Sequence, residues 1–252
     1  MDNSESGLEI DFGVSEISLA ELKGKDGESE DCYLADRDLK FFALFDGLDG
    51  EKGSHAVAEL ALKTTKNILA QYEVPTTSSN LAWMMERIND ILRESGEVGG
   101  TSCILARVVE GVDAPKLIFA AMGDSRIYLR KNGQAFQVTF DDDLRQKDLD
   151  AMKIFDPEKR KELMETKVRK YLNSGDKFEI SYNNSGEVAL NKGDRILICS
   201  DGVTGETDGE KLSTENITAI FGREFDDETT ARVFVRVARK MDDRTAIVIS
   251  VR

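Results

Sequence analysis

Three apolar segments of the chain each end at an aspartate that has a glycine beside it. They are residues 41–47 (FFALFDG), 118–124 (IFAAMGD) and 196–202 (ILICSDG), which place Asp46, Asp124 and Asp201 at the ends of expected strands. A fourth acidic site, Asp242-Asp243, directly precedes the last apolar segment. A single aspartate beside a glycine at a strand end is usually a turn. The repetition of the pattern favours a cluster of carboxylates.

Carboxylates gathered at strand ends repel one another and resist burial, so protons, basic side chains or bound cations must compensate their charge. Few basic residues flank these motifs. Mg²⁺ or Mn²⁺ is the natural partner because these ions prefer oxygen ligands and retain several waters. An adjacent glycine allows close approach of the backbone and offers its carbonyl as a further ligand. Two such ions can polarise a phosphoryl group and deprotonate a bridging water, which makes a side-chain nucleophile unnecessary.

Other hydrolytic mechanisms fit the sequence poorly. A cysteine phosphatase needs an arginine six positions after its cysteine, but the residues at that offset from the three cysteines are Asp38, Val109 and Gly205. The GDS triplet at 123–125 suggests a serine hydrolase, which needs a histidine base. His55 is the single histidine, and we interpret it as a surface residue, with a phosphate or proton-transfer role as the alternative. The chain has no P-loop motif.

The composition favours one globular domain that spans residues 1–252. The 34 basic and 48 acidic residues give a net charge of −14, which disfavours nucleic acid and anionic membranes as partners. Three scattered cysteines without CxxC spacing predict no disulfide and no zinc site, and they favour a cytoplasmic protein. The acidic N-terminus lacks the features of a secretory signal, and no apolar run reaches membrane-spanning length.

Periodicity predicts helices at 54–71, at about 80–96 and at 227–240. Strands are expected at 41–45, 102–109, 116–122, 126–130, 134–139, 178–182, 188–190, 195–199 and 245–251. Because strands and helices come in blocks, we expect antiparallel sheets covered by helices. Residues 140–175 are densely charged and carry two sparse helical patterns, which predicts a surface insertion.

Six short motifs, taken in order, resemble those of one family, the metal-dependent protein serine/threonine phosphatases (PPM, or type 2C). They are Glu30-Asp31, residues 41–50 (FFALFDGLDG), Gly99-Gly100-Thr101-Ser102, Gly123-Asp124-Ser125-Arg126, residues 193–202 (GDRILICSDG) and Asp242-Asp243-Arg244-Thr245. The resemblance implies an α+β fold, a four-layer α/β/β/α sandwich of two mainly antiparallel sheets flanked by helices. It also implies that residues 140–175 form a flap beside the substrate groove.

The same resemblance implies a site for two Mg²⁺ or Mn²⁺ ions and a phosphoprotein substrate. Asp46 would bridge both ions, and the carbonyl of Gly47 would bind one of them. Asp201 and Asp242 would be ligands of the other ion. Asp31 and Glu30 would act through bound water, and Asp124 would belong to a weaker third metal site.

The chain departs from the family pattern on the substrate side. Where the family usually has a phosphate-binding arginine, this chain has Asp26, so that Lys25 or Lys23 would have to take its place. Leu48, Asp49 and Gly205 also differ from the usual residues. Two functions follow as hypotheses. The first is hydrolysis of phosphoserine and phosphothreonine in proteins, and the second is a weak or inactive pseudophosphatase that acts as an interaction or regulatory domain.

Overall fold

The computed structural model describes residues 12–19, 29–48, 52–142, 171–173, 184–205, 212–240 and 242–251. Its strands form two sheets in which all hydrogen-bonded neighbours are antiparallel. The β3 sheet has the order β2 (Asp31–Asp36), β3 (Phe41–Asp46), β4 (Cys103–Val109), β5 (Lys116–Met122) and β8 (Ser185–Ala189). The β9 sheet has the order β1 (Phe12–Leu19), β10 (Arg244–Val251), β9 (Arg195–Cys199), β6 (Arg126–Lys131) and β7 (Gln134–Gln137).

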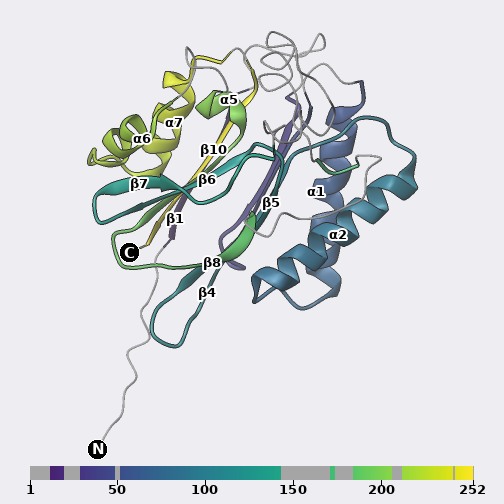
Figure 1. The fold of residues 1–252 in the computed structure, drawn as a ribbon, viewed down its shortest axis with the longest axis horizontal. Coiled ribbons are helices and arrows are strands. Elements are labelled where there is room, and N and C mark those ends of the chain that lie inside the picture. Colours follow the sequence, from purple (N-terminus) through teal and green to yellow (C-terminus); the bar gives the residue numbers. More distant parts are fainter. Residues whose placement is uncertain are drawn as a thin grey trace, which may run out of the picture.

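Helices cover the outer face of each sheet. Figure 1 shows α1 (Ser54–Gln71) and α2 (Ser78–Ser95) on one side of the strands, and α6 (Thr214–Phe221) and α7 (Asp227–Val237) on the other. The short helix α5 (Asp201–Thr204) lies at one end of the strands (Figure 1). The α+β class and the four-layer α/β/β/α sandwich are therefore confirmed.

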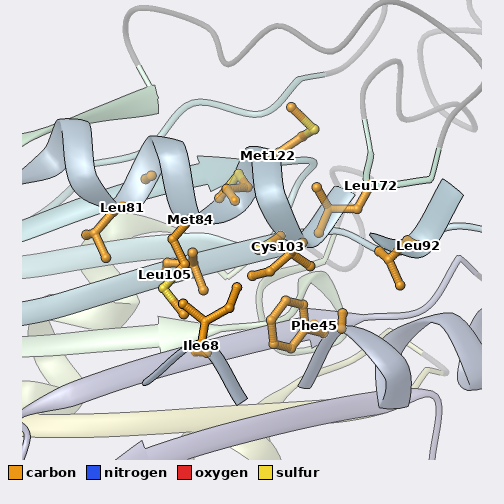
Figure 2. Packing of buried hydrophobic residues seen from close by; sticks show 14 of the residues in the cluster. Phe45, Ile68, Leu81, Met84, Leu92, Cys103, Leu105, Met122 and Leu172 are labelled. Atoms are coloured by element: carbon orange, nitrogen blue, oxygen red, sulfur yellow. The ribbon is translucent and has the colours of Figure 1, made fainter. Parts of the chain in front are cut away.

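Strand β3 is apolar up to its last residue because both of its faces are buried. In β3, Phe42 and Leu44 pack into the core between the two sheets, whereas Phe41, Ala43 and Phe45 pack toward α1 and α2. Figure 2 shows this helix-side core, with Phe45 beside side chains from both helices and from β4. Since side chains alternate along a strand, Asp46 lies on the face that carries Phe42 and Leu44. The final residue of β3 is thus directed toward the space between the sheets.

Local signals explain the ends of α2. The Thr77 hydroxyl oxygen accepts a hydrogen bond from Asn80 N at 3.1 Å, so that this threonine is the N-cap. Gly96 ends the helix with a φ of 75°, a left-handed conformation that glycine adopts readily. The expected helices at 54–71 and at about 80–96 are therefore confirmed.

Other expected elements differ from the structure. Helix α7 ends at Val237 and not at residue 240, because Ala238 adopts a non-helical conformation with ψ at 142°. The strand expected at 188–190 lies at Ser185–Ala189, and the strand expected at 134–139 ends at Gln137. Strands β1 and β2 and helices α5 and α6 were not among the expected elements. The strand expected at 178–182 and most of the expected flap at 140–175 lie outside the described residues. Among the helices that are described, none has both the length and the apolar character needed to span a membrane.

Candidate metal centre

Asp31 and Asp46 face each other at one edge of the β3 sheet. They are register partners in the antiparallel pairing of β2 with β3. Tyr33 and Ala35, which alternate with Asp31 along β2, pack against the core between the sheets. Both carboxyl groups therefore lie on the face that looks toward the β9 sheet.

The β9 sheet holds one oxygen of Asp31. Thr245 Oγ1 donates to Asp31 Oδ2 at 2.7 Å and Ser200 Oγ donates to the same oxygen at 3.0 Å. Ser200 Oγ also accepts a hydrogen bond from Thr245 N at 2.9 Å, which fixes the two hydroxyl groups relative to each other. All three residues are buried. These bonds link the first residue of β2 to the sheet opposite.

Among the described residues, none donates a hydrogen bond to the other oxygen of Asp31. Asp31 Oδ1 is buried and unpartnered in the structure. Burial raises the pKa of Asp31 to about 6, against the opposing effect of hydrogen bonds from Thr245 and Ser200. The neighbouring carboxyl of Asp46 can form a hydrogen bond with Asp31 only when one of the two acids carries a proton. An unpartnered buried carboxylate oxygen of this kind fits a cation or a protonated neighbour.

Asp46 lies among the other predicted aspartates. Burial raises its pKa well above the usual value, and the negative charges of four carboxyl groups raise it further. In order of decreasing effect, these groups belong to Asp31, Asp201, Asp124 and Asp242. The structure thus gathers the five predicted aspartates from both sheets into one group, which we call the acidic cluster.

The main chain of Asp46 is fixed by the two residues that precede β4. Its carbonyl accepts hydrogen bonds from Thr101 Oγ1 at 2.9 Å and from Ser102 N at 2.8 Å. The next residue, Gly47, donates from its N–H to the carbonyl of Glu30 at 3.2 Å. A Cβ at position 47 would lie 3.1 Å from that carbonyl oxygen, so the close approach of these two segments favours glycine.

Asp201 and Asp242 come from the β9 sheet. Asp201 is the first residue of α5, after Ser200, and only 6% of it is exposed. The segment before β10 is tied to the β3 sheet, because Glu30 N donates to Asp243 Oδ2 at 2.6 Å. Asp243 N in turn donates to Asp242 Oδ1 at 2.9 Å. These two bonds hold Asp242, before β10, close to the start of β2.

Lys240, which sequence reasoning placed at the end of a helix, lies between these two aspartates. Its ammonium forms ion pairs with Asp201 Oδ2 and, at 2.9 Å, with Asp242 Oδ2. The sequence shows a lysine two positions before Asp242, which was the available signal for this contact. Because residues 238–240 were interpreted as helical, the contact was not expected: it depends on the chain leaving the helix after Val237.

Asp124 follows β5 in the GDSR motif. Gly123 has a φ of 102°, which turns the chain at this point, and Gly123 N donates to Asp142 Oδ2 at 3.3 Å. The hydroxyl groups of Ser125 and Ser102 are 2.7 Å apart, which joins this turn to the start of β4. The motif therefore positions Asp124 beside the segment, containing Ser102, that fixes the main chain of Asp46.

The remaining candidate residues are Lys25, Lys23 and His55. Lys25, the candidate phosphate-binding residue, and its alternative Lys23 lie outside the described residues. His55 lies at the start of α1, and its Nε2 is 3.9 Å from Glu59 Oε2 on the same helix. Its side chain is 36% exposed.

The donor set fits a hard divalent ion in chemical type. Carboxylate oxygens dominate the acidic cluster, Asp31 Oδ1 is unpartnered, and the Lys240 ammonium stands where positive charge is needed. In the part of the chain that the structure describes, no three acidic, imidazole or thiol groups converge closely enough to enclose one ion. Lys240 holds one oxygen of Asp201 and one of Asp242. These two candidate ligands are therefore arranged around an ammonium group and not around a metal ion.

A comparison with known families covers the part of the chain that carries this site. The family profile described as Protein phosphatase 2C matches residues 28–245, which include every member of the acidic cluster. The chain belongs to the protein phosphatase 2C family. The expected resemblance is therefore confirmed.

Curated relatives in the protein phosphatase 2C family match part of this chain. Probable protein phosphatase 2C 58 of Arabidopsis thaliana is 33% identical over 131 residues, which cover 48% of this chain and 44% of the relative. Probable protein phosphatase 2C 17 of the same plant is 29% identical over 153 residues, which cover 56% and 50% of the two chains. The alignments thus span about half the length of these relatives.

Solved phosphatase structures share the fold over almost the whole chain. The serine/threonine phosphatase of S. agalactiae has a TM-score of 0.74 at 19% identity, and the match covers 96% of this chain and 100% of that chain. The catalytic domain of the phosphatase PstP, in complex with two manganese ions, has a TM-score of 0.71 at 21% identity and covers 96% and 98%. These likenesses confirm the sandwich architecture.

Proposed function

We propose that the protein is a metal-dependent phosphatase that hydrolyses phosphoserine and phosphothreonine in other proteins. The observation that carries this proposal is the acidic cluster, in which four aspartates from both sheets raise the pKa of Asp46. Membership of the protein phosphatase 2C family supports it. So does the similarity of fold to PstP, which was solved with two manganese ions.

Oxygen atoms of the acidic cluster would hold two Mg²⁺ or Mn²⁺ ions. Asp46 would bridge them, with the Gly47 carbonyl, Asp201 and Asp242 as further ligands. Asp31 and Glu30 would act through bound water, and Asp124 would belong to a third, weaker site. When bound, such ions polarise a phosphoryl group and lower the pKa of a coordinated water.

The protein's own hydrogen bonds would orient these groups. Thr101 and Ser102 fix the Asp46 main chain, which limits the movement of its carboxyl group. Ser200 and Thr245 hold Asp31 Oδ2 and leave Oδ1 able to accept a proton from water. Lys25 is the proposed partner of the substrate phosphate.

Hydrolysis of p-nitrophenyl phosphate with and without Mn²⁺ tests the proposal. We expect Mn²⁺-dependent turnover that Asp46→Asn and Asp201→Asn each reduce by about 100-fold or more, since each removes a ligand charge. Asp113→Asn is the matched control, because Asp113 is exposed in the turn between β4 and β5. Undetectable turnover of pure protein at millimolar Mn²⁺ would contradict the proposal.

A second candidate is a pseudophosphatase that keeps the fold and serves as an interaction domain. Asp26, which stands where the family has its phosphate-binding arginine, favours it. This candidate predicts metal binding without hydrolysis, together with a partner protein that co-purifies. Metal-dependent turnover that Asp46→Asn removes would exclude it.

The state of the three cysteines supports a proposal about the cellular compartment. Cys32, Cys103 and Cys199 are all free in the structure. Free thiols suit a reducing environment, so we place the proposed phosphatase in the cytoplasm.

A further inference from the structure

We infer that Lys240 is an internal counterion, whose ammonium neutralises Asp201 and Asp242 in the metal-free protein and must withdraw before a divalent ion binds both carboxylates. This inference rests on the metal binding that the proposed function requires. It adds a residue that sets how tightly the metal is held. It also gives the metal-free protein a defined state in place of an uncompensated acidic site.

The contacts of Lys240 are shielded from water. Its Nζ pairs with Asp201 Oδ2 and lies 2.9 Å from Asp242 Oδ2. The three side chains are only 17%, 8% and 13% exposed, in the order Lys240, Asp201 and Asp242. Because solvent screens such a pair weakly, its charge interaction is stronger than that of a surface ion pair.

The main chain holds Lys240 in this place. Helix α7 ends at Val237, and Ala238, with ψ at 142°, leaves the helical conformation. Arg244, at the start of β10, then donates from Nη2 to the Lys240 carbonyl at 2.6 Å and from Nε to the same oxygen at 3.2 Å. A third bond joins Arg244 Nη1 to the Val235 carbonyl at 3.3 Å. Arg244 therefore anchors the segment that carries the lysine at both of its ends.

An ammonium and a divalent ion cannot use this place together. The ammonium takes Asp201 Oδ2 and Asp242 Oδ2, and a divalent ion held by the same two carboxylates would lie within a few ångströms of it, where the positive charges repel strongly because water is scarce. The lysine pairing and metal binding to both carboxylates are therefore mutually exclusive. The apparent affinity for the metal is therefore lowered by the free energy needed to displace the ammonium.

Isothermal titration of the chelator-treated full chain with Mn²⁺ tests this competition. Lys240→Met removes the charge and keeps the length of the side chain, so we expect roughly tenfold tighter binding at the Asp201 and Asp242 site. Lys240→Arg keeps the charge and should stay within about threefold of the natural chain. Lys116→Met is the matched control, since it also removes a lysine–carboxylate pair, with Glu187, at the opposite end of β5.

Two further measurements separate competition from a merely structural role. In excess chelator, Lys240→Met should melt several degrees lower than the natural chain, because two carboxylates lose their counterion. In the natural chain, saturating Mn²⁺ should speed acetylation of Lys240 by an amine-reactive reagent, read by mass spectrometry, and leave Lys116 unchanged. This acetylation test uses no variant, so it stands even if Lys240→Met fails to fold.

The outcomes distinguish the two proposals. Mn²⁺ binding of equal or weaker affinity in Lys240→Met, with no change in Lys240 acetylation, would overturn the counterion role and leave the proposed phosphatase intact. Failure of both the natural chain and Lys240→Met to bind Mn²⁺ would overturn the proposed metal site and the counterion role with it. Tighter binding in the variant, with faster acetylation in the natural chain, supports both.

Discussion

The guanidinium of Arg126 forms a two-point ion pair with Asp141. Nε lies 2.9 Å from Oδ1, and Nη2 lies 2.7 Å from Oδ2. Its remaining nitrogen, Nη1, donates to Thr204 Oγ1 at 2.8 Å and to the Gly205 carbonyl at 3.2 Å. One buried side chain thus joins the start of β6, the segment that leads out of the β6–β7 hairpin and the end of α5. Helix α5 begins at Asp201.

We therefore expect Arg126→Met to lower the free energy of unfolding by about 2–4 kcal/mol. The value lies below that of a fully buried pair because the Asp141 side chain is 25% exposed. Urea titration measures it. Arg232→Met is the control, since the Arg232–Glu228 pair on α7 is exposed and such pairs contribute about 0.5 kcal/mol. Equal losses in the two variants would contradict this account of Arg126.

Gly202 lies against the chain that carries Asp242. A Cβ at this position would lie 1.8 Å from the Asp243 carbonyl oxygen, a contact that a main-chain atom cannot relieve without moving. Gly202→Ala should therefore lower the melting temperature by several degrees and weaken Mn²⁺ binding, as seen by calorimetry. Gly186→Ala should leave both nearly unchanged, because its Cβ would meet Phe119 at an ordinary 3.4 Å.

The stability of the metal-free protein should depend on pH through Asp31. Its pKa is about 6 in the folded protein, mainly because of burial, against 3.8 for the unconstrained side chain. The folded state therefore binds more protons between these values, so its stabilising contribution is complete below pH 3.8 and is lost as pH rises through about 6.

Thermal melting in chelator should accordingly show a higher midpoint at pH 5.5 than at pH 7.5. Asp31→Asn should reduce this dependence, because the amide does not titrate in this range, and the part that remains is that of Asp46, whose pKa burial also raises. A midpoint that rises with pH equally in both proteins would refute the assignment.

The thiols should be unreactive in the folded protein. Cys103 and Cys199 are fully buried, and burial raises the pKa of Cys199 to about 12 and that of Cys103 well above its usual value. Burial also raises the pKa of Cys32, which is half-buried, to about 12. At pH 8 all three remain thiols, so the chromogenic disulfide DTNB should react slowly with native protein and with three groups after denaturation. Rapid reaction of native protein would contradict this.

The sequence predicts those parts of the fold that depend on local pattern. The apolar run of β3 ends at Asp46 where the pattern predicts, and the caps of α2 at Thr77 and Gly96 follow from residue type. The repeated aspartate–glycine strand ends predict a cluster of carboxylates, and the register of β2 with β3 places Asp31 opposite Asp46.

Contacts between distant residues could not be predicted in this way. The hydroxyl groups that hold Asp31 come from Ser200 and Thr245, which are 169 and 214 residues away in the chain. The path of residues 238–240 is set by Arg244 and by Lys240's ion pairs, which override the helical pattern. Strand β1 was missed because its pairing with β10 joins the two ends of the described chain.

The division of the acidic cluster between two sheets also bears on how the protein folds. Asp31 and Asp46 belong to one sheet, and Asp201 and Asp242 to strand ends of the other, so neither sheet alone carries a complete site. Closing a loop of more than two hundred residues is slow, and the site forms only when the sheets dock. A divalent ion would then stabilise the native state after the rate-limiting step. It would slow unfolding and leave the refolding rate almost unchanged.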